Sequence, residues 1–153
     1  MTSRAFDVIA KLYGKTLATA ESCTGGGIGH ALTAVPGASN VYKGGVISYC
    51  NEIKAKLLNV SEGLLNTHGA VSATVAQAMA QGARKALNTD IAVSVTGLAG
   101  PSGDGFGNPV GTVFVGYVDE NTVVSRHFLF SGDRDAIRKQ AVDAALELIL
   151  ENI

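Results

Sequence analysis

The feature that most constrains the fold is a short apolar run that leads into a glycine cluster. Residues 16–20 have the composition and length of a buried strand, and the sequence Glu-Ser-Cys-Thr-Gly-Gly-Gly follows at residues 21–27. Glycines suit a tight turn, so we predict a strand, a turn and then a helix over residues 24–34. Such a turn exposes backbone N–H groups and a helix N-terminus, which favour an anion or a developing oxyanion. Ser22 stands where a nucleophile would be useful.

The rest of the chain alternates between helix and strand patterns. Further strands are predicted over residues 46–50, 91–95, 110–118 and 123–130, and further helices over residues 4–13, 51–58, 72–86 and 134–149. The continuously apolar run at 91–95 is typical of a central strand covered on both faces. The last two strands, separated by residues 119–121, indicate a hairpin. This order predicts an α/β fold, a three-layer α/β/α sandwich with a mostly parallel mixed sheet, in a single domain over residues 1–153.

The helix patterns also predict caps and buried faces. In the first helix, Ser3 is the expected N-cap, and Phe6, Ile9 and Tyr13 lie at helical spacing. Later N-caps are expected at Asn51, Ser72 and Asp133. The residues expected to face the core in the last two helices are Val75, Met79, Ala83 and Ala86, followed by Ile137, Ala141, Ala144 and Leu148.

Composition narrows the class of protein. Hydrophobic residues make up 46% of the 153 residues and charged residues 16%, which suits a compact enzyme domain. A net charge of -1 indicates neither nucleic-acid binding nor attraction to an anionic membrane. The sequence shows neither a signal-peptide pattern nor an apolar run of membrane-spanning length, so we expect a cytoplasmic protein. Cys23 and Cys50 are too few for a disulfide framework and are expected to be buried, reduced thiols.

Three segments with chemically useful residues follow predicted strands, namely 21–27, 48–54 and 96–101. In sheets of this kind, ligands bind in the crevice beyond the carboxyl ends of the strands. The glycine cluster alone is weak evidence, because it lacks the ending of a P-loop and the spacing of a dinucleotide fingerprint. A simple tight turn explains that cluster equally well. The agreement of the three segments is therefore the stronger indication of a site.

Lys54 is the candidate general base. If Asn51 is the N-cap, Lys54 lies in the first helical turn, where the helix dipole opposes its charge. Desolvation in a cleft also lowers the pKa of a lysine, and a neutral lysine can deprotonate a serine. Tyr49 is a candidate to relay the proton or to orient the substrate. The alternative interpretation is a solvated surface Lys54 beside a half-buried Tyr49.

Arg134 and Arg138 are four residues apart and share one helix face, so they are candidates to clamp a phosphate. The alternative is a local ion-pair network with Asp133 and Asp135. The three histidines of the chain have no ligand spacing, and the sequence predicts no metal site.

Six strings of this chain resemble the C-terminal domain of the CinA proteins, and the resemblance covers nearly the whole chain. They are AESCTGG at 20–26, SYCNEIK at 48–54, HGAVS at 68–72, TGLAGP at 96–101, PVGTV at 109–113 and GDRDAIR at 132–138. One departure is Cys50, where a serine or another small residue is expected. No residue is carried over from the loop at 102–108.

The resemblance implies an amidohydrolase that converts nicotinamide mononucleotide to nicotinic acid mononucleotide and ammonia in pyridine-nucleotide (NAD) salvage. Ser22 is similar to the family's nucleophile, with Tyr49 and Lys54 as activating partners. The residues expected to bind substrate are Cys23, Thr24, Gly25, Gly26, Thr96, Gly97, Ala99, Gly100, Arg134 and Arg138. We expect a small-molecule nucleotide as the partner, a homo-oligomeric assembly, and no metal or other cofactor.

Two alternatives stay open on the sequence alone. The first is a nucleotide-binding or interaction module that keeps the pocket without useful catalysis. The second is a cysteine hydrolase that uses Cys23 with His68, although a thiolate needs a partner within reach and Lys54 has no role in it.

Overall fold

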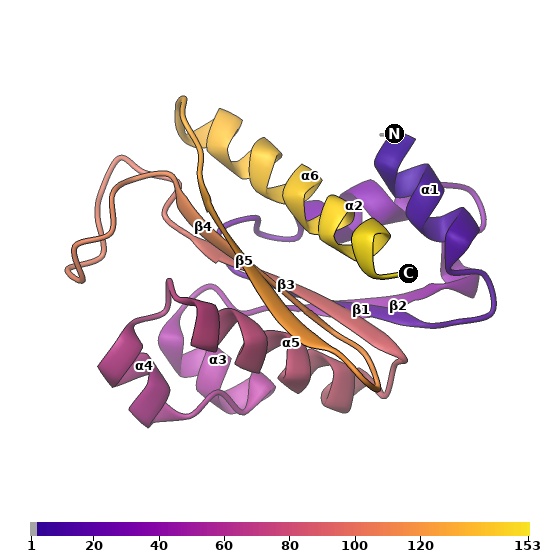
Figure 1. Ribbon diagram of the computed structural model, residues 1–153, viewed down its shortest axis with the longest axis horizontal. Helices are drawn as coiled ribbons and strands as arrows, with labels where there is room; N and C mark the ends of the chain where they lie inside the picture. Colours follow the sequence, from indigo (N-terminus) through magenta and orange to yellow (C-terminus); the bar gives the residue numbers. More distant parts are fainter. Residues whose placement is uncertain (1–2) are drawn as a thin grey trace.

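A five-stranded mixed sheet lies between two layers of helices in the computed structural model, which describes residues 3–153 (Figure 1). The strands are β1 (Leu17–Glu21), β2 (Tyr42–Ile47), β3 (Ile91–Gly97), β4 (Thr112–Val118) and β5 (Val123–Leu129). The helices are α1 (Ser3–Lys11), α2 (Gly27–Thr33), α3 (Asn51–Leu58), α4 (Glu62–His68), α5 (Ala73–Leu87) and α6 (Arg134–Asn152), with a 3₁₀ turn η1 (Ala38–Asn40). The predicted three-layer α/β/α sandwich is confirmed.

The strand order is β2-β1-β3-β4-β5. Strand β1 pairs in parallel with both β2 and β3, whereas β4 pairs antiparallel with β3 and with β5. Only β4 therefore runs against the other strands, which agrees with the mostly parallel mixed sheet. Because β1, β2 and β3 are parallel, their carboxyl ends meet at one edge, where Glu21 is in register with Ile47 and with Val95.

Helices α1, α2 and α6 cover one face of the sheet, and α3, α4 and α5 lie on the other (Figure 1). Strand β3 is buried on both faces, because Val93 packs into the core under α6 while Ala92 packs into the core over α5. The doubly covered central strand is thus confirmed, and so is the hairpin of β4 and β5. Among the helices of residues 3–153, none has the length and apolar character needed to cross a bilayer.

Two of the predicted caps are confirmed by side-chain hydrogen bonds. Ser72 accepts from the N–H of Val75 at 3.3 Å at the start of α5, and Asp133 accepts from the N–H of Ala136 at 2.9 Å at the start of α6. The four residues expected to face the core from α6 are all buried, which confirms that face. These caps fix where α5 and α6 begin relative to the sheet.

The predicted face of the first helix is correct at Ile9 and wrong at Phe6 and Tyr13. Helix α1 begins at Ser3 itself, and its buried stripe is Ala5, Val8 and Ile9, which continues at Leu12 beyond the helix. That stripe follows the i, i+3, i+4, i+7 spacing of an amphipathic helix, and Phe6 lies outside it. Phe6 is 53% exposed and Tyr13 is 77% exposed.

Several other expectations about individual elements need correction. Ala86 is exposed, since the buried stripe of α5 passes through Ala80 and Ala83 to Leu87. Strand β2 begins four residues and ends three residues earlier than expected, because this edge strand alternates between exposed and half-buried positions and carries little apolar signal. Helix α4 was not predicted at all, although Ser61 caps it by accepting from the N–H of Leu64.

Candidate active site

A cavity of about 350 Å³ lies where the parallel strands β1, β2 and β3 end. It is lined by most of the residues that the sequence pointed to: Ser22, Cys23, Tyr49, Lys54, Thr96, Gly97, Ala99, Gly100 and Arg134. The three segments predicted to meet at the strand ends therefore do line one cavity. The topology of the sheet explains this meeting, since parallel strands bring their carboxyl ends to the same edge.

Ser22 and Lys54 are in direct contact in this cavity. Ser22 follows β1 directly and is fixed by its N–H, which donates to the carbonyl of Val95 at 3.1 Å. The Nζ atom of Lys54 lies 3.0 Å from Ser22 Oγ and donates to the carbonyl of Ser48 at 2.8 Å. Ser48 follows β2, so the ends of all three parallel strands and helix α3 hold this pair in place.

Burial sets the charge state of Lys54. The side chain is only 2% exposed, and desolvation lowers its pKa to about 8. No carboxylate among residues 3–153 forms an ion pair with it. A neutral amine here can donate to the Ser48 carbonyl and accept the hydroxyl proton of Ser22. The predicted fall in pKa is found, and the alternative of a solvated Lys54 is wrong.

The expected helix start near Lys54 shifts by one residue. Asn51 is the first residue of α3 and Cys50 is the N-cap, with no hydrogen bond from its side chain. The Lys54 N–H donates to the carbonyl of Cys50 and so closes the first turn. Desolvation, more than the helix dipole, therefore accounts for the low pKa of this lysine.

Because Lys54 is buried and its pKa is lowered, we predict that this residue destabilises the fold at neutral pH. Its pKa falls from 10.5 to about 8, and a shift of this size corresponds to roughly 3 kcal/mol at a pH below both values. Lys54→Met should therefore raise the free energy of unfolding at pH 7 by up to about 3 kcal/mol. Between pH 8 and 10.5 the unfolded chain binds more protons than the folded one, so the free energy of unfolding of the wild type increases as the pH rises. The difference in this free energy between Lys54→Met and the wild type therefore becomes smaller. Urea denaturation of both proteins at pH 7 and pH 10 measures their free energies of unfolding. The same difference between the two proteins at both pH values would contradict the prediction.

The helix N-terminus after the glycine cluster is already occupied by a carboxylate. Glu21 is 2% exposed and accepts from Thr24 Oγ1 at 2.7 Å and from the N–H groups of Gly26, Ile28 and Gly29 at 3.2, 2.9 and 3.0 Å. Helix α2 accordingly begins at residue 27 rather than near residue 24. The expectation that this helix end is open to a substrate anion is wrong, because Glu21 satisfies its donors.

Only two N–H groups of the turn remain available to an oxyanion. The N–H of Gly25 donates to the carbonyl of Ser22 at 3.0 Å, and that of Gly26 donates to Glu21. Gly25 and Gly26 have φ values of 58° and 100°, a left-handed geometry that favours glycine. Within residues 3–153, the N–H groups of Cys23 and Thr24 have no hydrogen-bond partner. These two are the candidate oxyanion donors.

Arg134 lines the cavity and contacts neutral groups. Its Nη1 donates to the carbonyl of Gly100 at 2.6 Å, and its Nη2 donates to the hydroxyl of Tyr49 at 2.8 Å. Tyr49 is 61% exposed, and across the described chain it has no hydrogen bond to Ser22 or Lys54. The geometry therefore links Tyr49 to Arg134 rather than to the Ser22–Lys54 pair.

Arg138 does not line the cavity, although it was expected to bind substrate. Its guanidinium donates to the backbone carbonyls of Cys23 and Thr24. The alternative network with the neighbouring aspartates is wrong, since Asp135 pairs with Lys139 at 3.0 Å and no described ion pair involves either arginine. Thr24, Gly25 and Gly26 also lie outside the cavity lining; of these three, only Thr24, which follows the lining residue Cys23, has a free N–H within residues 3–153.

With this geometry established, comparison with known proteins identifies the family. The family model of the CinA C-terminal domain matches residues 3–153. The chain belongs to the CinA C-terminal domain family. It is 46% identical to a CinA-like protein of Geobacter metallireducens and 48% identical to one of Microcystis aeruginosa, covering 91% of this chain in each case. The chain spans about a third of the length of these relatives, 34% of each.

Solved structures of CinA proteins share this fold. A CinA superfamily protein of Escherichia coli superposes with a TM-score of 0.95 at 32% identity, covering 98% of this chain and 88% of that one. A competence/damage inducible protein of Agrobacterium tumefaciens gives a TM-score of 0.91 at 34% identity, covering 99% and 96%. The α/β sandwich described above is therefore the fold of this family.

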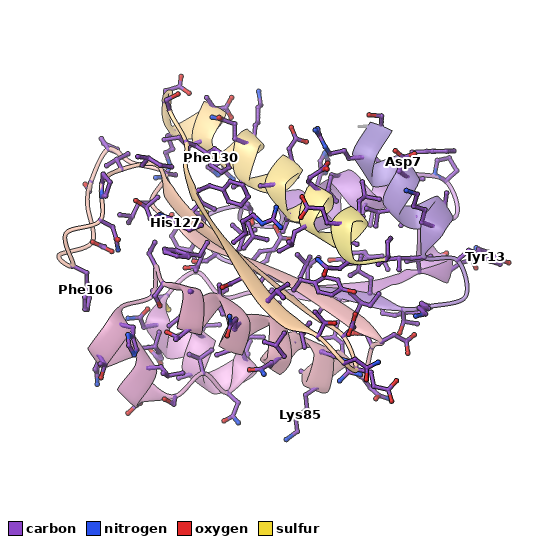
Figure 2. All side chains as sticks on the ribbon, viewed as in Figure 1. Asp7, Tyr13, Lys85, Phe106, His127 and Phe130 are labelled. Atoms are coloured by element: carbon purple, nitrogen blue, oxygen red, sulfur yellow. The ribbon has the colours of Figure 1, made fainter. Side chains whose placement is uncertain are left out.

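Sequence reasoning missed part of the cavity of this CinA domain. Apart from Arg134, the lining residues outside the three predicted segments are Ala70, Val71, Ser102 and Asp104. Asp104 lies in the loop between β3 and β4, whose tip carries Phe106 (Figure 2). Asn108 holds this loop, since its Nδ2 donates to Asp104 Oδ2 at 2.7 Å and to the carbonyl of Val71 at 3.3 Å. No local pattern in the sequence indicates such a long-range contact.

The cysteines of this CinA domain do not favour a thiol nucleophile. Cys23 is buried, and desolvation raises the pKa of its thiol to about 11, so it is protonated at neutral pH. His68 is exposed at the end of α4 and has no described hydrogen bond to Cys23. Both cysteines are free, but Cys50 is exposed rather than buried as expected. Nowhere in residues 3–153 do three or more His, Cys, Asp or Glu side chains form a metal-binding group.

Proposed function

We propose that this CinA domain is an amidohydrolase that converts nicotinamide mononucleotide to nicotinic acid mononucleotide and ammonia. The observation that supports this proposal is the 3.0 Å contact between Lys54 Nζ and Ser22 Oγ inside a cavity. A buried lysine with a pKa of about 8 and no carboxylate partner among residues 3–153 is suited to accept a proton from the serine it contacts. The choice of substrate follows from the similarity of the six sequence strings to the family.

In the first half of the proposed reaction, Ser22 Oγ attacks the carboxamide carbon and Lys54 accepts the hydroxyl proton. The oxygen of the tetrahedral intermediate then takes up negative charge and is stabilised by the N–H groups of Cys23 and Thr24. A single donor of this kind is typically worth about 3–4 kcal/mol in the transition state. Lys54 passes its proton to the amide nitrogen, the C–N bond breaks, and ammonia leaves an ester on Ser22.

In the second half, water attacks the ester carbon and Lys54 accepts a proton from that water. The bond between the carbonyl carbon and Ser22 Oγ breaks as Lys54 returns the proton to the serine. The product is a carboxylic acid, which ionises at neutral pH. One lysine thus acts as base and then as acid in each half of the reaction.

Arg134 is the proposed contact for the substrate phosphate. Both of its partners, the Gly100 carbonyl and the Tyr49 hydroxyl, are uncharged, so its positive charge has no described counter-ion. We expect Arg134→Ala to raise KM for nicotinamide mononucleotide by about 10- to 100-fold, since a charge-assisted contact contributes about 1.5–3 kcal/mol.

Steady-state kinetics of ammonia release measures this effect. Free nicotinamide has no phosphate, so any activity on it should fall far less than the activity on the mononucleotide. An equal loss on both substrates would show that Arg134 is structural.

The proposed function is tested by incubating the protein with nicotinamide mononucleotide, nicotinamide and glutamine in an ammonia-coupled assay. We expect ammonia and an equal amount of nicotinic acid mononucleotide from the first compound, and little from the other two. Saturable binding of the mononucleotide without ammonia would contradict the proposal and favour a nucleotide-binding module.

A further inference from the structure

Arg138 of α6 binds the backbone of the turn that follows the nucleophile. Its Nε donates to the carbonyl of Cys23 at 2.9 Å, and its Nη2 donates to the carbonyl of Thr24 at 3.3 Å. No carboxylate in the described chain forms an ion pair with this half-buried guanidinium. Its charge is therefore directed at two peptide groups next to Ser22.

The turn lies directly against α6. A Cβ atom at Gly25 would lie 3.4 Å from Arg138 Nη2, and one at Gly27 would lie 2.9 Å from Val142 Cγ2. At the second distance a side chain at residue 27 would force Val142 or the turn to shift, so glycine allows the turn to approach the helix this closely. The position of the turn thus depends on α6, which lies more than 100 residues away in the sequence.

The geometry of the peptide bond connects this contact to the free N–H groups. In a planar trans peptide, the C=O and the following N–H point in opposite directions. Because the Cys23 carbonyl points to Arg138, the N–H of Thr24 points away from α6. The Ser22 carbonyl accepts from the N–H of Gly25, which in the same way fixes the N–H of Cys23. These are the two N–H groups that have no described partner.

We propose that Arg138 is a positioning residue that orients and polarises the Cys23–Thr24 peptide, so that its N–H stabilises the oxyanion formed when Ser22 attacks. This inference rests on the proposed Ser22 mechanism. A positive charge at the carbonyl oxygen draws electron density from the amide and makes its N–H a stronger donor. The benefit arises only when the oxyanion forms, so Arg138 supports kcat rather than substrate binding.

Substitution of the two arginines of α6 is therefore expected to change different kinetic parameters. Arg134 lines the cavity and is expected to affect KM, whereas Arg138 lies outside the lining and is expected to affect kcat. From the sequence alone the two arginines cannot be distinguished, because both lie on one helix face and both are candidates to bind a phosphate.

The test compares kcat and KM for nicotinamide mononucleotide in Arg138→Ala and Arg138→Gln. We expect kcat to fall by about 10- to 100-fold, with KM changed by less than about threefold, because a weakened oxyanion contact acts on the transition state. Arg138→Lys, which keeps the charge, and millimolar guanidinium added to Arg138→Ala should each restore part of kcat. Arg126→Ala is the matched control, since Arg126 also contacts α6, through Glu151, but far from the turn.

Thermal denaturation gives the folded fraction to which each kcat is corrected. A raised KM with unchanged kcat would overturn the proposal, because it would place Arg138 in substrate binding. A loss of activity explained by the folded fraction alone would overturn it as well. If Arg138→Ala does not fold, Arg138→Gln decides, and a wild-type kcat in that variant is the contrary result.

A second readout separates this inference from the choice of substrate. Diisopropyl fluorophosphate reacts with an activated serine: Ser22 Oγ bonds to phosphorus, fluoride leaves, and Lys54 accepts the hydroxyl proton. If the wild type releases no ammonia but is labelled at Ser22, the proposed substrate is wrong. In that case the role of Arg138 is still supported if Arg138→Gln is labelled more slowly than the wild type while Arg126→Ala is labelled at the wild-type rate. A wild type that shows neither reaction overturns both proposals.

Discussion

Ser22→Ala is expected to reduce ammonia release from nicotinamide mononucleotide by roughly 1,000-fold or more. Loss of a nucleophilic serine removes the covalent route, and effects of this size or larger are typical of serine hydrolases. The side chain is small, and in the described part of the chain its hydroxyl has a hydrogen bond only with Lys54, so the fold should persist. The ammonia-coupled assay measures the loss, and thermal denaturation confirms that the variant is folded.

Ser22→Cys is the conservative control and is expected to keep at most a trace of activity. Near-normal turnover in Ser22→Ala would show that the serine mechanism is wrong. In that case Cys23, which lines the same cavity, becomes the first candidate, and Cys23→Ala tests it.

The second large effect concerns the pH dependence carried by Lys54. The active form is the neutral amine, so kcat/KM should rise with pH through a pKa of about 8 and then level off. Lys54→Met should abolish this rise of kcat/KM with pH and lower kcat/KM by about 100- to 10,000-fold. Lys54→Arg should lose activity to a similar extent, because a guanidinium does not give up its proton in this pH range.

The arginine variant provides the sharpest contrast, since it keeps the charge but not the base. Full activity in Lys54→Arg would show that residue 54 contributes only charge. Tyr49 or a bound water would then have to accept the proton of Ser22. An unchanged pH profile in Lys54→Met would contradict the assignment in the same way.

The architecture could be predicted from the sequence because its strongest patterns come from burial. The apolar run of β3 and the long stripe of α6 read as buried elements in the sequence, and the structure covers both. Patterns fail at the edges of the molecule. Strand β2 is half exposed, and the large side chains Phe6 and Tyr13 lie on the surface while Ala5 packs inside. Hydrophobicity alone does not say which side chain a closely packed neighbour has room for.

The site could be predicted in part for a topological reason. Segments after parallel strands must meet, so Ser22, Lys54 and the residues after β3 could be grouped without coordinates. The contacts of side chains with distant backbone groups could not be grouped in this way. Arg138 and the Cys23 carbonyl are 115 residues apart, and nothing local distinguishes this arginine from Arg134.

Glu21 shows the same limit at short range. Its place before the turn suggested no role, yet it caps α2 and fills the position expected for a substrate anion. A carboxylate shortly before a glycine-rich helix start can satisfy that helix itself, and the sequence does not separate this case from an open anion site.

The identity of the acylated residue tests the central claim most directly. Wild-type protein is quenched with acid during turnover of nicotinamide mononucleotide, digested, and examined by mass spectrometry for the acyl group of the substrate. The account predicts that the acyl group is attached to Ser22, and that Ser22→Ala carries none and releases ammonia at least about 1,000-fold more slowly. An acyl group on Cys23, or sustained turnover by Ser22→Ala, would contradict it.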